Sequence, residues 1–277
     1  MGVRDASGAR GAHEEERCKA MNQSERRLFL IKALLDERPE LSATRIPSDV
    51  RGQRLLLRAL FNTRQPGLPA DEVLRVQDDY LAGRIADAGV TDYRSLAPVR
   101  PHVYLWQGDI TTLACDAIVN AANSGMTGCW APNHICIDNC IHTFAGVQLR
   151  WECAQLMEEQ GYPEPTGRAK ITKAYNLPSK HVIHTVGPIA NGSPTDEHRR
   201  QLAQSYRSCY DLACNSGLQS LAYCCISTGV FGFPQEEAAY IATESVLELQ
   251  AGDAKPLDVI FNVFEDRDLE LYSKLSG

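Results

Sequence analysis

The sequence predicts an α/β fold in which strands alternate with helices, preceded by a separate helical region. From residue 23 to about 92 the apolar residues follow a helical period, whereas from residue 100 they form short runs typical of strands. Strands that alternate with helices favour layers packed on a largely parallel or mixed sheet. We therefore divide the chain into a flexible N-terminus (1–22), an N-terminal helical region (23–95) and an α/β domain (100–277).

Three helices are expected in the N-terminal helical region, because apolar residues recur there on one helical face. The second helix follows Ser48 or Asp49, either of which can cap it, and the third follows Pro69 and Asp71. The residues expected on the three apolar faces are Leu28, Ile31 and Leu35; Leu56, Leu60 and Phe61; and Val73, Val76 and Tyr80. None of these residues indicates chemistry, so the region is interpreted as a helical appendage of the main domain.

The α/β domain should contain at least five strands with helices between several of them. The expected strands are 102–106, 116–122, 181–187, 220–227 and 258–264, and the expected helices are about 138–160, 196–216, 235–250 and 266–275. In open α/β sheets ligands bind beyond the carboxyl ends of the strands. Functional residues are therefore expected in the loops that follow the strands.

Composition narrows the classes of protein and of partner. Lys and Arg number 28 against 35 Asp and Glu, a net charge of −7 that disfavours a general nucleic-acid or membrane-surface binder. We find neither an apolar run near the roughly 20 residues needed to span a bilayer nor a secretory signal. The chain is therefore expected to be cytoplasmic, with its ten cysteines as thiols, metal ligands or small core residues rather than disulfides.

Four loops after expected strands carry candidate binding residues. Asp109 follows the first strand and can accept hydrogen bonds from an exocyclic amine or cap the next turn. The segment 120–125 (NAANSG) offers two carboxamides that can meet sugar hydroxyls, although Asn often only forms turns. The segment 227–234 (STGVFGFP) precedes a helix, and its glycines let backbone N–H groups approach an anion. Phe264 ends the last strand, where its ring can stack on a base or belong to the core.

The segment 128–138 (GCWAPNHICID) gathers metal-binding side chains beside a carboxylate. Cys129, His134 and Cys136 form a C-x4-H-x-C pattern with no obvious fourth ligand. Catalytic zinc sites use three protein ligands and keep one position free, whereas structural sites are usually closed by four. Cys140 lies one helical turn beyond Cys136 and remains a possible fourth ligand, while core packing is expected for Cys153, Cys224 and Cys225.

Four ordered motifs carry a family resemblance: GDIT (108–111), DAIVNAANS (116–124), TGRAKITKAYNLPSKHVIHTVGP (166–188) and STGVFGFP (227–234). From about residue 100 to the C-terminus the chain resembles a macrodomain of the MacroD type, an ADP-ribose-binding fold. The resemblance implies a three-layer α/β/α sandwich with a mixed sheet of about six strands. It also implies the following roles: Asp109 reads the adenine amine beside Ile110, Phe264 stacks near the adenine, Asn123 holds the distal ribose, and the loop of Ser227, Thr228, Gly229, Val230, Phe231 and Gly232 wraps the diphosphate.

One departure from the MacroD pattern concerns the metal. Family members usually carry a glycine run before the segment that matches 137–146 (IDNCIHTFAG), and here GCWAPNHIC replaces it. That replacement, together with the helical extension, resembles the zinc-containing macrodomain subclass, whose ligands match Cys129, His134 and Cys136. The resemblance thus implies one Zn²⁺ per chain. Asp138 matches the family's acidic residue beside the distal ribose, and its i+4 neighbour His142 is interpreted as a structural partner.

The resemblance implies a zinc-dependent hydrolase that removes mono-ADP-ribose from Asp or Glu side chains of proteins. Asp138 and Asn123 would act on the substrate, with the metal as a Lewis acid. The alternatives are a reader module that binds ADP-ribose without cleaving it and an O-acetyl-ADP-ribose deacetylase. The subclass is linked with a sirtuin-type transferase, so the resemblance implies a modified lipoyl-carrier protein as a partner. The charge balance, in turn, predicts neither a nucleic-acid nor a membrane partner.

Overall fold

The structure is a computed structural model that describes residues 21–276. Of the N-terminal segment predicted to be flexible, residues 1–20 lie outside this range, so that prediction is untested. Within residues 21–276 we find no helix with the length and apolar character needed to cross a membrane.

The α/β domain is built on a mixed seven-stranded sheet. In spatial order its strands are β2 (Pro98–Arg100), β3 (Val103–Gln107), β9 (Asp258–Val263), β8 (Ser220–Tyr223), β5 (Ala117–Ala121), β7 (His181–Thr185) and β6 (Ala169–Lys173). The five inner strands are parallel, and the two edge strands are antiparallel to their neighbours. A short parallel pair, β1 (Thr91–Asp92) with β4 (Leu113–Ala114), lies outside this sheet. All five expected strands form, although β8 is shorter than the expected 220–227 and leaves Cys224 and Cys225 beyond its end.

Strand β6 was not expected from the sequence. In its sequence AKITK, Lys170 and Lys173 belong to opposite faces of the strand, so neither face carries the apolar pattern of a buried strand. It lies at the edge of the sheet, where only one neighbour must be paired and polar side chains are tolerated.

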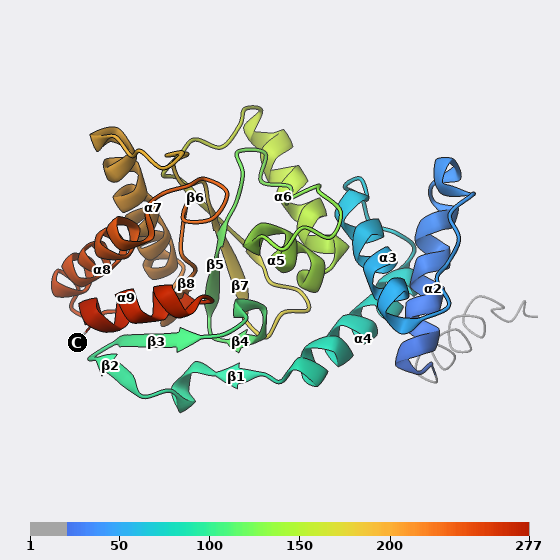
Figure 1. Ribbon diagram of the computed structural model, residues 1–277, viewed down its shortest axis with the longest axis horizontal. Coiled ribbons are helices and arrows are strands. Elements are labelled where there is room, and N and C mark those ends of the chain that lie inside the picture. Colours follow the sequence, from blue (N-terminus) through green and yellow to red (C-terminus); the bar gives the residue numbers. More distant parts are fainter. Residues whose placement is uncertain (1–20, 277) are drawn as a thin grey trace, which may run out of the picture.

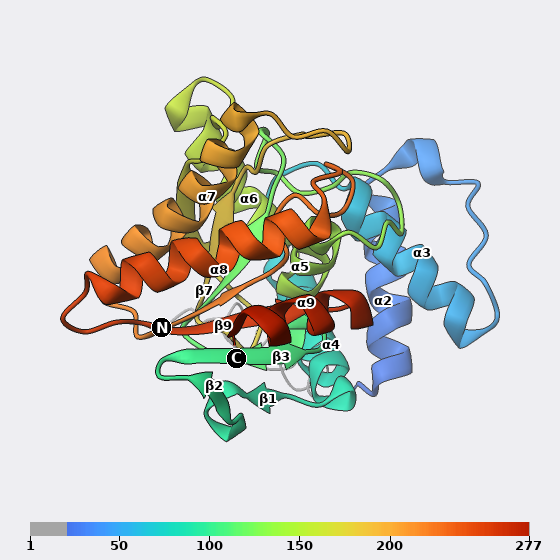
Figure 2. The ribbon, with the colours of Figure 1, turned by 60° about the vertical axis from the view of Figure 1, so that its left-hand side comes forward.

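Helices cover both faces of the sheet, which confirms the three-layer architecture (Figures 1 and 2). One face carries α7 (Asp196–Asn215), α8 (Gln235–Ala251) and α9 (Asp266–Ser276), and the other carries α5 (Ile137–Ala145) and α6 (Val147–Gln160). The stretch 138–160, expected as one helix, is broken at Gly146, whose φ of 98° no helix allows. The side chain of Gln77 accepts a hydrogen bond from the Val147 N–H and so helps to start the second helix.

The N-terminal helical region contains α2 (Gln23–Asp36), α3 (Val50–Thr63) and α4 (Asp71–Ala88), with the 3₁₀ turn η1 (Pro39–Leu41) between the first two. It has an apolar cluster of its own, which Val147 of α6 joins. Asp49 caps α3, because its side chain accepts a hydrogen bond from the Gly52 N–H at 2.8 Å. Of the two caps that the sequence offered, Ser48 and Asp49, the structure thus uses Asp49. The face expected for α2 was partly wrong: Leu30, Ile31 and Leu34 are buried, whereas Leu28 and Leu35 are only half-buried. Two further 3₁₀ turns, η2 (Tyr93–Ser95) and η3 (Ile110–Thr112), flank the first strands.

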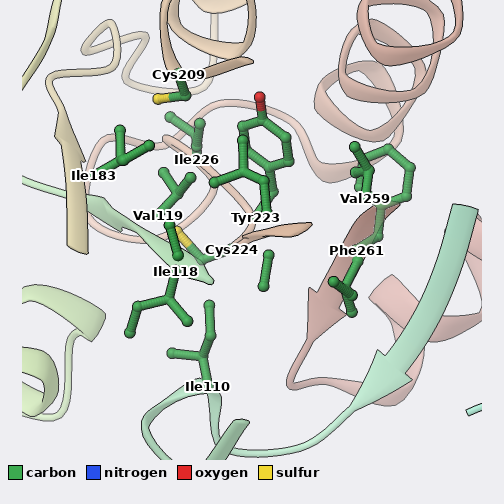
Figure 3. Packing of buried hydrophobic residues seen from close by; sticks show 14 of the residues in the cluster. Ile110, Ile118, Val119, Ile183, Cys209, Tyr223, Cys224, Ile226, Val259 and Phe261 are labelled. Carbon is green, nitrogen blue, oxygen red and sulfur yellow. The ribbon is translucent and has the colours of Figure 1, made fainter. Parts of the chain in front are cut away.

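The main core extends over both faces of the sheet, against α7–α9 on one face and α5 and α6 on the other, and Figure 3 shows part of it. Its strands are apolar on both faces because both faces are covered by helices. Cys209 and Cys224 lie among these aliphatic side chains, and Cys153 is buried in the same cluster. The core role expected for Cys153 and Cys224 is thus observed, whereas Cys225 is only half-buried.

Candidate functional site

The predicted site residues lie just beyond the carboxyl ends of four neighbouring parallel strands. Because β3, β9, β8 and β5 are neighbours in that order and run parallel, their carboxyl ends lie side by side. Asp109 follows β3, Phe264 follows β9, residues 227–232 follow β8, and Asn123 follows β5. Three strand intervals of about 4.8 Å separate the first from the last by roughly 14 Å. The sheet therefore sets these groups in a row, suited to an elongated ligand.

At the β3–β9 end, Asp109 and Phe264 present groups to solvent. Asp109 caps η3, because its Oδ1 accepts from the Thr111 N–H at 3.0 Å and the Thr111 hydroxyl at 2.7 Å. Its Oδ2 has no hydrogen bond within residues 21–276, so capping leaves one oxygen for a ligand donor. The Phe264 side chain is 77% exposed, which excludes a core role and leaves its ring free for stacking. Ile110 is buried beneath and holds the turn in place.

The loop of Ser227, Thr228, Gly229, Val230, Phe231 and Gly232 has the features of an anion site. Ser227 and Gly232 adopt positive φ angles of 67° and 65°, and the Phe233 N–H closes the turn on the Ser227 carbonyl at 2.9 Å. Among the described residues, the N–H groups of Gly229, Val230 and Phe231 make no hydrogen bond. Helix α8 starts at Gln235, directly after this loop, so its positive end adds to the attraction.

A second loop, missed by the sequence analysis, supports the first. The Ala190 and Asn191 N–H groups donate to the Phe231 carbonyl at 2.8 and 3.1 Å, and the Gly192 N–H donates to the Gly232 carbonyl at 2.7 Å. A Cβ at Gly232 would lie 3.2 Å from the Asn191 Cα, so the two loops approach closely because this residue is glycine. The Asn-Gly pair at 191–192 was the available signal for such a turn.

At the β5 end, Asn123 and Asp138 are in direct contact. Asn123 Nδ2 donates to Asp138 Oδ2 at 3.2 Å and to the Gly128 carbonyl at 3.1 Å. Asp138 is only 4% exposed, and burial raises its pKa to about 6. Hydrogen bonds from Asn120 and Asn123 and the positive charge of Arg150 oppose that rise. Near neutral pH this carboxylate can therefore both accept and release a proton.

Beneath Asp138 lies a buried polar layer that the sequence analysis did not identify. The Asn120 carboxamide is fully buried, and its Nδ2 donates to Asp138 Oδ1 at 2.8 Å and to His184 Nδ1 at 3.1 Å. Burial lowers the pKa of His184 to about 3, so its ring is neutral. Since Nδ1 accepts, Nε2 carries the proton and donates to the Thr172 hydroxyl at 2.9 Å. Of the two carboxamides in NAANSG, only Asn123 can therefore meet a sugar.

His142 shares a helical face with Asp138, as its i+4 spacing predicts. Its Nε2 lies 3.6 Å from Asp138 Oδ1, and burial lowers its pKa well below the usual range. Within the described range neither ring nitrogen has a hydrogen-bond partner. Cys136 is the N-cap of α5, and Asp138 lies in the first turn of this helix.

The three predicted metal ligands converge on the loop between β5 and α5; residues 128–136 are called the donor loop below. The ligand atoms of Cys129, His134 and Cys136 all lie within 4.8 Å of one another, and Cys129 Sγ is 3.6 Å from His134 Nδ1. A tetrahedral zinc ion at usual bond lengths sets a sulfur and a nitrogen ligand about 3.6 Å apart. Two thiols and an imidazole at this spacing fit zinc.

Cys140 does not join these donors. Its Sγ instead receives a hydrogen bond from Arg58 Nη2 at 3.3 Å. Burial raises the pKa of the Cys136 thiol to about 12, and the Asn139 N–H opposes that rise. A second cluster of ligand atoms, His142, Cys153 and His184, is wholly buried, but both ring nitrogens of His184 are already engaged. Of the two clusters, the donor loop is thus the better candidate for a metal site, and three of its side chains could serve as ligands.

Comparisons with known proteins agree with this geometry. Residues 119–242 match the model of the Macro domain family. The chain is 54% identical over 259 residues to a protein-ADP-ribose hydrolase from Treponema medium, covering 92% of this chain and 99% of the relative. It is 42% identical over 242 residues to a Fusarium oxysporum f. sp. cubense protein named "Probable bifunctional ADP-ribose hydrolase/ADP-ribosyltransferase", covering 80% of this chain and 40% of that protein. Among solved structures, a Trypanosoma brucei macrodomain in complex with ADP-ribose superposes with a TM-score of 0.61 at 30% identity, over 79% of this chain and 95% of that chain.

Proposed function

This chain belongs to the macrodomain family and is a protein-ADP-ribose hydrolase, and we propose that its activity depends on one zinc ion and removes ADP-ribose esterified to Asp or Glu side chains. The observation that carries the proposal is the convergence of Cys129, His134 and Cys136 beside the pair of Asn123 and Asp138. A reader module would need the nucleotide-binding loops but neither a metal nor a buried carboxylate. The relatives' names likewise favour an enzyme over a reader.

The row of groups at the carboxyl ends of β3, β9, β8 and β5 matches the order of groups in ADP-ribose. Asp109 Oδ2 accepts from the adenine amine, and the exposed Phe264 ring stacks on the base. The N–H groups of Gly229, Val230 and Phe231, which have no partner within residues 21–276, bind the diphosphate at the start of α8. This order leaves the distal ribose at the end of β5, where Asn123 and the donor loop lie.

At that end the chain's own residues orient the sugar and handle the proton. Asn123 holds the Asp138 carboxylate and, through the Gly128 carbonyl, the start of the donor loop. Asp138 accepts a proton from the attacking water, and its pKa of about 6 suits it to return that proton to the departing sugar hydroxyl. Cys129, His134 and Cys136 would hold the zinc ion, which supplies Lewis acidity when bound. One water is consumed, and the ester becomes a free carboxylate and free ADP-ribose.

The modified partner protein is a further part of the proposal. The family resemblance implies a lipoyl-carrier protein modified by a sirtuin-type transferase. The name of the fungal relative supports a link with such chemistry, because it joins an ADP-ribose hydrolase to an ADP-ribosyltransferase. O-acetyl-ADP-ribose presents the same ester to the same groups and belongs in the assay as a second substrate.

Metal removal tests the proposal. Protein stripped with a chelator should lose turnover of a carrier protein that bears glutamate-linked mono-ADP-ribose, recover it with added Zn²⁺, and keep its affinity for free ADP-ribose. A serine-linked carrier should be cleaved far more slowly. Cys136→Ser should abolish turnover and lower the zinc content, whereas the matched control Cys140→Ser should retain both. Full turnover by the stripped protein would refute zinc dependence, and equal turnover of both carriers would refute the preference for acidic residues.

A further inference from the structure

Helix α3 of the N-terminal helical region packs directly against α5 and the donor loop (Figure 1). We propose that Arg58 and Asn62 of α3 hold the donor loop in its metal-binding conformation before the metal arrives, so that the N-terminal helical region is a working part of the zinc site. This inference rests on the zinc site of the proposed function. It assigns positioning roles to two residues some 70 to 80 positions away from the ligands they support.

Asn62 stabilises the turn that precedes the histidine ligand. Its side chain is 1% exposed, and its Oδ1 accepts from the Asn133 N–H at 3.0 Å. Asn133 has a φ of 58°, a left-handed conformation that is uncommon outside glycine but that asparagine adopts more readily than most residues. The same carboxamide donates from Nδ2 to the Thr143 hydroxyl on α5 at 3.0 Å. Asn62 thus ties the turn before His134 to both α3 and α5.

Arg58 fixes the backbone of the donor loop at the ligands themselves. Its Nη2 donates to the His134 carbonyl at 2.8 Å and to Asn139 Oδ1 at 2.9 Å. With its oxygen held in this way, the buried Asn139 carboxamide directs its N–H groups to the carbonyls of Ala131, at 3.0 Å, and Cys129, at 3.4 Å. The Asn139 backbone N–H points at Cys136 Sγ at 3.5 Å. Arg58 and Asn139 together therefore contact the residues of all three ligands.

Arg150 of α6 fixes the end of α3 to the residues that lead into the donor loop. Its Nη1 donates to the carbonyls of Phe61, Asn62 and Arg64 at the C-terminal end of the helix. Its Nε donates to the Thr127 carbonyl at 2.8 Å, and its guanidinium lies 4.2 Å from the centroid of the Trp130 ring. The position of α3 is therefore set relative to the donor loop, and α3 can serve as a fixed support.

Preorganisation explains why such support matters. An ion that binds a loop already in the coordinating conformation need not offset the entropy of ordering that loop. Loss of partners that orient metal ligands commonly lowers metal affinity by about 10–100-fold. The contacts of Arg58 and Asn62 are of this kind, because they hold the backbone and not the metal.

The zinc affinity of the full chain tests the proposal, measured by competition with a chromophoric chelator on metal-free protein. Arg58→Gln should weaken Zn²⁺ binding by about 10–100-fold. The matched control is Arg54→Gln, one turn earlier on α3 and exposed, with no side-chain hydrogen bond within residues 21–276; it should bind zinc like the wild type. Affinity for free ADP-ribose should change less than about twofold in both variants, since α3 supports the donor loop and neither Asp109 nor the 227–232 loop. Equal zinc affinity in Arg58→Gln and Arg54→Gln overturns the proposal.

Hydrogen exchange on metal-free wild-type protein gives a second test that needs no variant. The Asn133 amide should be protected before zinc is added, because Asn62 accepts its hydrogen bond. Protection that arises only with zinc would show that the metal orders the loop, and would overturn the proposal even if Arg58→Gln failed to fold. A wild-type chain that binds no zinc would instead refute the zinc site of the proposed function, and the present inference with it.

Discussion

Replacing Asn120 with leucine tests whether Asp138 is held from inside the sheet. Leucine has the same branched skeleton of heavy atoms as asparagine, so the change removes two donors without opening a large cavity. The lost contacts are Nδ2 to Asp138 Oδ1 at 2.8 Å and Nδ2 to His184 Nδ1 at 3.1 Å. A hydrogen bond to a charged group contributes about 1.5–3 kcal/mol and a neutral one about 0.5–1.5 kcal/mol. Since both contacts are buried, Asn120→Leu should lower the free energy of unfolding by about 2–4.5 kcal/mol.

The same substitution should lower kcat more than it changes binding. Without Asn120 the Asp138 carboxylate keeps, among residues 21–276, only Asn123 as a hydrogen-bond donor. A displacement near 1 Å at a reacting group can cost about 10²-fold in rate. The affinity for free ADP-ribose should be nearly unchanged, because Asp109 and residues 227–232 lie along other strands. Urea unfolding gives the stability, and steady-state hydrolysis of a mono-ADP-ribosylated carrier separates kcat from KM.

Asn176→Leu is the matched control for this prediction. Asn176 also donates from Nδ2 to a carboxylate, Asp78 Oδ1 at 2.8 Å, and to a second acceptor, the Ala145 carbonyl at 2.9 Å, at the far end of α5 from Asp138. It should lose less stability than Asn120→Leu, because its contacts are only half-buried, and kcat should stay within about twofold, because no group at the reacting end changes position. A folded Asn120→Leu protein with wild-type kcat, or an equal fall in kcat for Asn176→Leu, would refute the positioning role of Asn120.

Three further predictions follow from single residues. Phe264→Ala, at a side chain 77% exposed, should leave the free energy of unfolding within about 0.5 kcal/mol but weaken ADP-ribose binding in calorimetry by about 1–3 kcal/mol. Phe261→Ala, at a side chain on β9 that is 2% exposed, should instead cost about 3–5 kcal/mol of stability. Gly128→Ala should destabilise the protein more than Gly161→Ala in thermal unfolding. Both glycines have a positive φ (84° and 75°), but among the described residues only a Cβ at position 128 would meet a neighbour, His142 Cγ at 2.8 Å. Equal losses would show that His142 moves aside at no cost. His184 has a folded pKa of about 3 against 6.5 unfolded, so the unfolded chain binds the extra proton and stability is lost as pH falls from 6.5 towards 3. The raised pKa of Asp138 changes stability in the opposite direction, so the wild type is compared with His184→Asn. Between pH 7 and 4.5 the free energy of unfolding, measured in urea, should fall by roughly 2–3 kcal/mol more for the wild type than for the variant. Parallel plots of this free energy against pH would contradict the prediction.

Much of the fold could be predicted from the sequence, because it rests on the local periodicity of apolar residues. All five expected strands and the helices after residue 196 form, with small shifts at their ends. The errors lie where a tertiary contact overrides or replaces the local signal. Strand β6 is polar because it lies at the sheet edge, and the 138–160 stretch breaks at Gly146, where Gln77 from α4 accepts from Val147.

For the site, the sequence by itself determined which residue types follow which strand, and the C-x4-H-x-C spacing determined that Cys129, His134 and Cys136 can converge. Only the tertiary structure decided that Asn120 is turned inward to His184 while Asn123 faces Asp138, and that the Cys140 thiol contacts Arg58 instead of the other donors. It also decided that a helical region with no chemical signal of its own supports the donor loop, through Arg58 and Asn62. The physical reason is the separation along the chain: a periodic pattern reports neighbours three or four residues apart, whereas these contacts join residues up to 82 positions apart and exist only once the layers have packed.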